Sequence, residues 1–191
     1  MQKSLAILSL TFTFSLLTFF TVYASPLITP WPIINTTGSG PTRGITDILL
    51  ITAVSMSFVL LALRRWRLPF GTFTFMFGVN GALMVAFAPH SVLVSIPTAL
   101  LGGLAADLLY RFLQPSVDQP FSVRLFAFLV PLAFYSLYLV DLAIVGPIIF
   151  QLGIVWSAPF WAGTPVIAGI AGFLLSFVML PPAQPAEGKN S

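Results

Sequence analysis

The stretch from Ile45 to Arg67, ITDILLITAVSMSFVLLALRRWR, decides the fold class of this chain. Residues 45–63 are mostly apolar, with Asp47 as their one charged residue, and three arginines follow within the next four positions. An α-helix rises about 1.5 Å per residue, so about 20 apolar residues cross the ~30 Å hydrocarbon core of a bilayer. The stretch therefore predicts a transmembrane helix that ends among positive charges at one membrane surface.

The composition of the whole chain also indicates a membrane environment. Of its 191 residues, 58% are hydrophobic and 7% are charged, whereas a soluble domain carries about 25% charged residues. The mean hydropathy is +1.00. The net charge of +3 comes from basic residues at the ends of apolar segments, so topology explains it better than nucleic-acid binding does. We therefore expect the lipid bilayer, and no nucleic acid, as the surroundings of this protein.

The apolar segments together predict an all-α fold, a polytopic transmembrane helix bundle with six spans. The expected spans cover approximately residues 4–23, 45–63, 69–88, 91–109, 121–145 and 161–180. A short interfacial or re-entrant segment is expected at 148–158, before the last span. The predicted organisation is a first transmembrane helix or signal peptide (1–24), a Pro/Gly-rich extracytoplasmic linker (25–44), a transmembrane helical domain (45–180) and a polar cytoplasmic tail (181–191).

The first apolar segment has two interpretations. Lys3 and the small-residue pattern before Ser25 fit a cleavable signal peptide, which would leave five spans. The apolar run of about 20 residues is longer than the usual h-region of about 7–15 residues, which favours a retained span. The sequence leaves both interpretations open, and neither changes the placement of the later helices.

The orientation of the bundle follows from its basic residues. With the Arg64–Arg67 loop in the cytoplasm, alternation of the spans places seven of the eight basic residues inside and only Arg43 outside. Trp66 then falls at the inner interface, and Trp31, Trp156 and Trp161 fall at the outer one. The sequence therefore predicts a cytoplasmic C-terminus, and the compact loops favour a bacterial inner membrane.

No residue pattern for catalysis, metal binding or nucleotide binding is present. Cysteine is absent, which removes disulfides, iron–sulfur ligation and thiol nucleophiles. His90 is the one histidine and Glu187 the one glutamate, too few for a metal site. We therefore expect no catalytic residue, no metal and no cofactor, and a protein that is not an enzyme.

Polar residues inside apolar segments remain as candidates for a binding site, because an unpaired polar group in hydrocarbon is energetically costly. The predicted polar pocket contains Asn80, Tyr135, Tyr138, Asp141 and Gln151. Asp141 has no basic residue nearby in sequence, and its alternative role is to mark the outer water interface. Asp107 lies four residues before Arg111, a spacing that predicts an ion pair at the membrane surface.

Small residues at helical spacing form two stripes that allow helices to pack closely. The residues of this predicted helix-packing interface are Ala99, Gly102, Gly103, Ala106, Ala168 and Gly172. Their partners are either other helices of the same chain or a second membrane protein.

The size, the helix count and the run from Leu101 to Asp107, LGGLAAD, resemble in outline the small membrane-embedded substrate-binding subunits of energy-coupling vitamin transporters. This resemblance implies a non-catalytic transport or solute-binding membrane component. The alternative is an accessory or assembly subunit of a larger membrane complex, in which the small-residue stripes would face outward onto other membrane-protein subunits. An intramembrane enzyme would need two convergent polar groups with assignable roles, and the sequence offers none.

Overall fold

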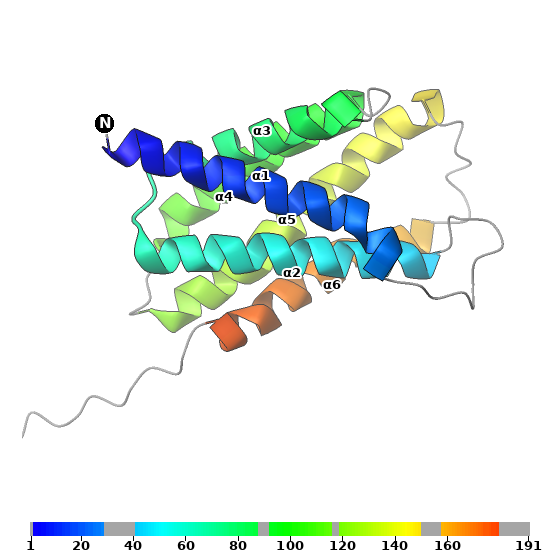
Figure 1. Ribbon diagram of the computed structural model, residues 1–191. Helices are drawn as coiled ribbons and strands as arrows, with labels where there is room; N and C mark the ends of the chain where they lie inside the picture. Colours follow the sequence, from blue (N-terminus) through cyan, green and yellow to red (C-terminus); the bar gives the residue numbers. More distant parts are fainter. Residues whose placement is uncertain (1, 29–40, 88–91, 116–118, 150–157, 180–191) are drawn as a thin grey trace, which may run out of the picture.

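The computed structural model describes residues 2–28, 41–87, 92–115, 119–149 and 158–179 (Figure 1). Within these ranges the chain forms six helices and no strand, which confirms the all-helical prediction. The helices are α1 (Gln2–Ile28), α2 (Pro41–Arg65), α3 (Thr72–Phe87), α4 (Val92–Leu113), α5 (Pro120–Ile149) and α6 (Ala158–Met179). Both ends of the predicted linker at 25–44 are helical, and α5 includes the first residues of the segment expected at 148–158. Gln151 and His90 lie outside the described residues.

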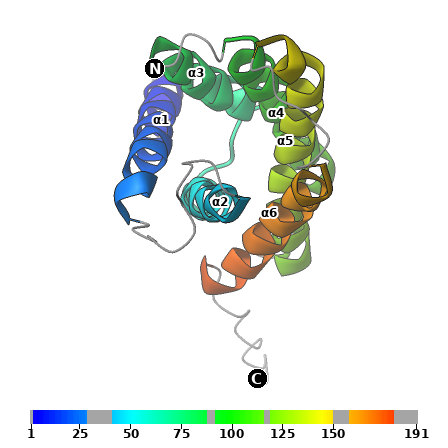
Figure 2. The ribbon, with the colours of Figure 1, turned by 90° about the vertical axis from the view of Figure 1, so that its right-hand side faces the viewer.

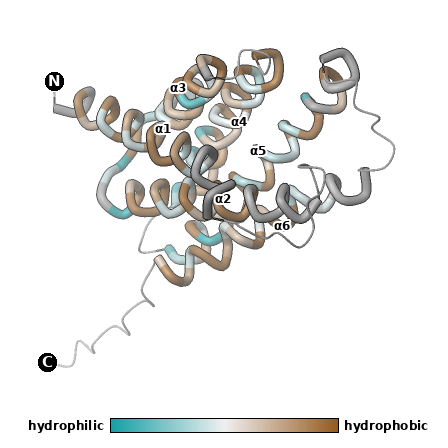
Figure 3. The backbone as a smooth tube through the Cα atoms, turned by 45° about the vertical axis from the view of Figure 1, so that its right-hand side comes forward, coloured by the Kyte–Doolittle hydropathy of each residue, from teal (hydrophilic) through white to brown (hydrophobic). Residues whose placement is uncertain are grey.

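Two of the described helices are long and apolar enough to cross a membrane, Val92–Leu113 and Pro120–Val145. The other four contain shorter apolar stretches, Leu5–Thr21, Ile48–Arg64, Thr72–Ala86 and Gly163–Met179. Large apolar side chains are also exposed along α1, α4 and α6. Figure 3 shows that hydrophobic residues recur along these helices. By length and composition, therefore, the structure supplies two candidate spans rather than six.

The helices pack as a closed series around a shared apolar core (Figure 2). Helix α1 contacts α2 and α3, and the series continues from α3 to α4, α5 and α6, which returns to α2. Phe73, Leu60 and Phe126 are among the most fully buried side chains of this core and come from three different helices. Because α1 supplies Phe14 to the same core with only 3% of its surface exposed, the first helix is an integral part of the packing.

Successive helices run in opposite directions, so the chain has an arginine end, defined by Arg64, Arg67, Arg111 and Arg124. Figure 1 shows the start of α1 and the ends of α2 and α6 at this end. The turn into α3 lies here, and Gly71 adopts a φ of +91°, which favours glycine because it has no Cβ. Helix α4 also stops here, where Gln114 adopts a φ of 43° and Pro115 follows.

Candidate functional site

An aromatic layer joins four helices in the middle of the bundle. The ring of Phe14 on α1 lies 5.4 Å from that of Phe77 on α3 and 5.9 Å from that of Phe58 on α2. Phe77 in turn lies 5.5 Å from Phe134 on α5, edge to face. Centroid separations of 4.5–7 Å are those of favourable aromatic pairs. These ring contacts link α1, α2, α3 and α5 at one level along the bundle.

Polar side chains on α1, α2 and α3 lie just beyond the aromatic layer, on the side away from the arginine end. Thr18 is four residues beyond Phe14, and Asn80 is three residues beyond Phe77. Helices α1 and α3 both run away from the arginine end (Figure 1), so each of these residues lies about 5 Å past the aromatic level. Ser15 on α1 and Thr52 on α2 belong to the same half of the bundle.

Four of these polar side chains have a buried oxygen with no hydrogen-bond partner: Ser15 Oγ, Thr18 Oγ1, Thr52 Oγ1 and Asn80 Oδ1. On α1, by contrast, the Thr11 hydroxyl donates to the carbonyl of Ile7 at 2.8 Å. That local bond is the usual way in which a helical hydroxyl is satisfied. The four unpartnered oxygens therefore stand out, because burial without a bond costs roughly 1–3 kcal/mol per group.

Asp141 on α5 lies in the same half of the bundle, seven residues beyond Phe134. The hydroxyl of Thr98 on α4 donates to Asp141 Oδ2 on α5 at 2.6 Å. Thr98 is buried and follows Pro97 inside α4. We define the polar layer as Ser15, Thr18, Thr52, Asn80, Thr98 and Asp141, which together come from all helices except α6. Asp141 thus accepts a hydrogen bond from a buried hydroxyl on the neighbouring helix.

The two tyrosines predicted for the pocket lie on α5 between Phe134 and Asp141. Tyr135 and Tyr138 pack with Ile48 and Ala168, at the contact of α5 with α2 and α6. Of the five residues of the predicted pocket, Asn80 and Asp141 belong to the polar layer as defined above, and the two tyrosines pack in the apolar contact of α5 with α2 and α6. Gln151 belongs to a segment that the structure does not describe.

One ionisable side chain belongs to the polar layer. The arginine side chains described by the structure all belong to the arginine end, and Asp141 is the one acidic residue in the layer. Among the described residues, no group of three or more histidine, cysteine, aspartate or glutamate side chains could hold a metal ion. In the part of the chain that the structure describes, the layer therefore presents oxygen acceptors and no cationic side chain.

Asp107 has a structural role that the sequence did not reveal. Its side chain is completely buried. The backbone N–H groups of Phe73 and Thr74 donate to its two carboxylate oxygens at 3.2 and 2.9 Å. The Thr74 hydroxyl donates at 2.7 Å as well. Asp107 on α4 thus caps the N-terminus of α3, where a negative charge is favourable, instead of pairing with the exposed Arg111.

The small-residue stripe of α4 faces other helices of the same chain. A Cβ atom at Gly103 would lie 2.6 Å from Thr74 Cα on α3, and one at Gly102 would lie 2.5 Å from the Phe134 ring on α5. Ala99 and Ala106 are buried in the same core. The α3–α4 and α4–α5 contacts therefore use this stripe, and it is not available as an outward face for a partner.

The stripe of α6 is used in the same way. A Cβ atom at Gly172 would clash with the carbonyl oxygen of Ala127 on α5, and Ala168 is fully buried. Beside this contact, the guanidinium carbon of Arg124 lies 4.0 Å from the centroid of the Phe177 ring. A cation over an aromatic face is attractive, so this pair also holds α5 against α6.

Sequence reasoning missed the four hydroxyl residues of the polar layer. Ser15 and Thr18 follow Thr11 at a spacing that places all three on one helix face, and this pattern inside an apolar segment could have identified them. Thr52 and Thr98 each share their helix with other hydroxyl residues, such as Ser55 and Ser95, so no local pattern marks them. Comparison with family models, curated proteins and solved structures found no match to this chain.

Proposed function

We propose that this chain is a six-span membrane protein that binds a small polar solute, neutral or positively charged, in the polar layer. It serves transport or solute binding without catalysing a reaction. The observation that carries the proposal is the set of four buried oxygens without partners on α1, α2 and α3. In a hydrocarbon environment such groups need a bound molecule or water to satisfy them.

The topology of the proposal rests on the packing of the helices. The four helices with short apolar stretches contact one another or the two long helices in one closed series. A bundle of this kind with apolar side chains on its outer faces is suited to lipid. The arginine end then faces the cytoplasm, as the positive-inside rule requires, together with the C-terminus. The polar layer lies in the outer half, and a bacterial inner membrane is the proposed location.

Retention of α1 is part of this proposal. A cleaved signal peptide would take Phe14, Ser15 and Thr18 with it. The aromatic layer would then lose the ring that contacts both Phe58 and Phe77. Six spans with both termini in the cytoplasm are therefore the arrangement that preserves the core.

The ligand class follows from the atoms that the layer presents. Hydroxyl groups, a side-chain amide and one carboxylate accept hydrogen bonds, and no described cation is present to pair with an anion. A molecule rich in N–H or O–H donors, such as a polyol or a small amine, matches this set. Organic acids and phosphates do not, because the Asp141 carboxylate would repel them.

A pair of threonine-to-valine variants on one helix tests the proposal. Thr18→Val removes an unpartnered hydroxyl, and Thr11→Val removes one that already bonds to Ile7. In detergent and without solute, we expect Thr18→Val to be as stable as the parent or about 1 kcal/mol more stable. Thr11→Val should lower the free energy of unfolding by about 1 kcal/mol, because it removes an existing hydrogen bond.

Solute binding is then measured as a thermal shift against panels of polyols, small amines and organic acids. The expected result is a shift with a polyol or amine that Thr18→Val and Asn80→Leu remove and Thr11→Val retains. If organic acids alone shift the parent, or if the two threonine variants bind equally, the proposed site is wrong. Extraction of the purified protein and mass spectrometry of the released solutes provide an independent readout.

A further inference from the structure

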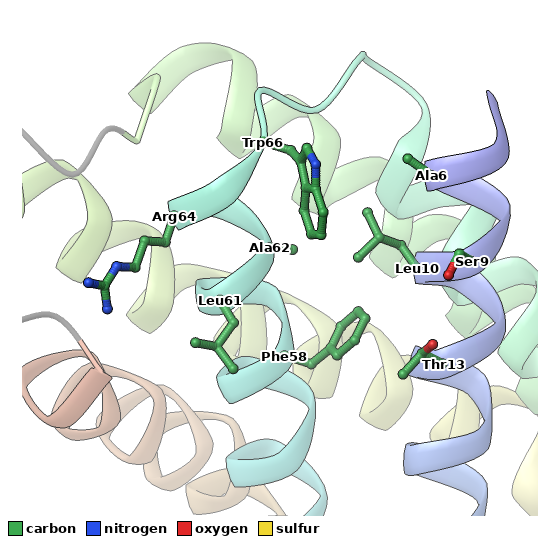
Figure 4. Close-up of a pocket in the computed structure, with 9 residues that line it drawn as sticks. All are labelled: Ala6, Ser9, Leu10, Thr13, Phe58, Leu61, Ala62, Arg64 and Trp66. Atoms are coloured by element: carbon green, nitrogen blue, oxygen red, sulfur yellow. The ribbon is translucent and has the colours of Figure 1, made fainter. Parts of the chain in front are cut away.

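A groove of about 620 Å³ lies between α1 and α2 near the arginine end. This volume falls within the range of roughly 300–1,000 Å³ that is typical of ligand pockets. Figure 4 shows Leu10 from α1 and Phe58 and Trp66 from the α2 side around the space between the two helices. The groove is separate from the polar layer, which lies beyond the aromatic ring of Phe14.

The lining of the groove changes in polarity along its length. Phe58 marks its inner part, and Arg64 and Trp66 mark the part at the arginine end. Six residues of helix separate Phe58 from Arg64, which corresponds to about 9 Å. Ser9 and Thr13 add exposed hydroxyls from α1. A molecule with a long apolar part and a polar head would therefore find matching surroundings for both.

The charge at the mouth of the groove is positive. Arg64 lies on its rim, and Figure 4 shows the guanidinium turned away from α1. Arg64 and the nearby Arg67 are both exposed, so these long side chains have the freedom to turn toward a bound head group. The one described carboxylate close to this end, that of Asp107, is fully buried and bonded to α3. No acidic side chain therefore lines the groove among the described residues.

We infer that this groove binds an anionic phospholipid, with an acyl chain along Leu10 and Phe58 and the head-group phosphate at Arg64 and Arg67. Basic sites between helices at the cytoplasmic surface bind anionic head groups in this way. Trp66 has the amphipathic ring that settles at the membrane interface. The inference depends on the proposed membrane location but not on solute binding in the polar layer.

Reconstitution in nanodiscs of equal parts phosphatidylcholine and phosphatidylglycerol tests this inference. Native mass spectrometry of the released protein counts the lipids that stay bound and distinguishes the two head groups. The expected result is selective retention of phosphatidylglycerol by the parent protein. Each of Arg64→Gln and Arg67→Gln should reduce this retention about fivefold, because one arginine near an anionic surface contributes about that factor. Arg111→Gln, at another exposed arginine near the end of α4, should change it less than twofold.

A second pair of variants tests the groove itself without altering charge. Ser9→Trp fills the groove from an exposed position on α1, and Leu8→Trp places the same ring on the same helix outside the groove lining. We expect Ser9→Trp to reduce phosphatidylglycerol retention at least tenfold and Leu8→Trp to leave it unchanged. Equal retention of the two lipids, equal effects of Arg64→Gln and Arg111→Gln, or retention that survives Ser9→Trp would each overturn the inference. So would a second polypeptide found in place of the lipid.

Discussion

Replacing Asp107 tests the cross-helix cap that joins α4 to the start of α3. The carboxylate accepts three hydrogen bonds, from the N–H groups of Phe73 and Thr74 and from the Thr74 hydroxyl. Hydrogen bonds to a charged group contribute about 1.5–3 kcal/mol each, and an unpartnered buried donor is unfavourable. Asp107→Asn keeps one acceptor oxygen but turns an amide N–H₂ toward the donors. We expect it to lower the free energy of unfolding by about 3 kcal/mol.

Further variants should lower the free energy of unfolding by graded amounts. Asp107→Leu removes every acceptor and should lower the free energy of unfolding by about 4–5 kcal/mol, as breaking a buried charged contact does. Thr74→Val removes only the hydroxyl bond and should lower it by about 1 kcal/mol. For a chain of this length, 1 kcal/mol corresponds to about 2–4 °C in the unfolding midpoint. Thermal unfolding in detergent should therefore show a decrease of about 6–12 °C for Asp107→Asn.

Arg111→Gln is the control that separates a cap from an ion pair. Arg111 is exposed on the next turn of α4, and changes at exposed positions usually stay within about 0.5 kcal/mol. If the sequence-based ion pair were the main role of Asp107, Arg111→Gln and Asp107→Asn would have similar effects. A parent-like midpoint for Asp107→Asn, or equal losses in these two variants, would refute the cap.

Three further predictions concern packing. Gly103→Ala should lower the free energy of unfolding by about 1–3 kcal/mol, because its Cβ would meet the backbone of α3; Gly163→Ala, with no atom within 4 Å of the added Cβ, should be neutral or stabilising by up to about 1 kcal/mol. Phe14→Ala should lower the free energy of unfolding by about 3–5 kcal/mol if α1 is retained. An unchanged unfolding midpoint, together with a measured mass for a chain that starts near Ser25, would show cleavage instead. A double-mutant cycle of Arg124→Gln with Phe177→Leu should give a coupling of about 0.5–1 kcal/mol; zero coupling would show that the cation–π contact does not contribute.

Local patterns in the sequence were sufficient for the helices and for their approximate positions. The apolar runs and the Arg64–Arg67 cluster are continuous in the chain, so the helical prediction needed no tertiary information. The helix ends were less accurate, because α1 continues to Ile28 and α2 begins at Pro41 inside the predicted linker. Proline in the first turn of a helix is compatible with its backbone geometry, so a proline-rich composition alone did not exclude helix there.

The candidate site was only partly predictable. Asn80 and Asp141 were recognisable as isolated polar residues in apolar segments. Their surroundings were not, because the partner of Asp141 is Thr98, 43 positions away in the chain. The aromatic layer that places Thr18 and Asn80 at one level likewise depends on contacts between different helices.

By itself, the amino-acid order determined that this chain is helical, apolar and basic at one end, because hydropathy and charge act over a few neighbouring residues. Tertiary structure decided which face of each helix is buried and which hydrogen-bond partner each polar atom has. Asp107 shows the difference: four positions from an arginine in sequence, its carboxylate bonds instead to backbone N–H groups 33 and 34 positions away. A helix N-terminus has N–H groups that its own turns cannot satisfy, and only the folded arrangement shows which side chain satisfies them.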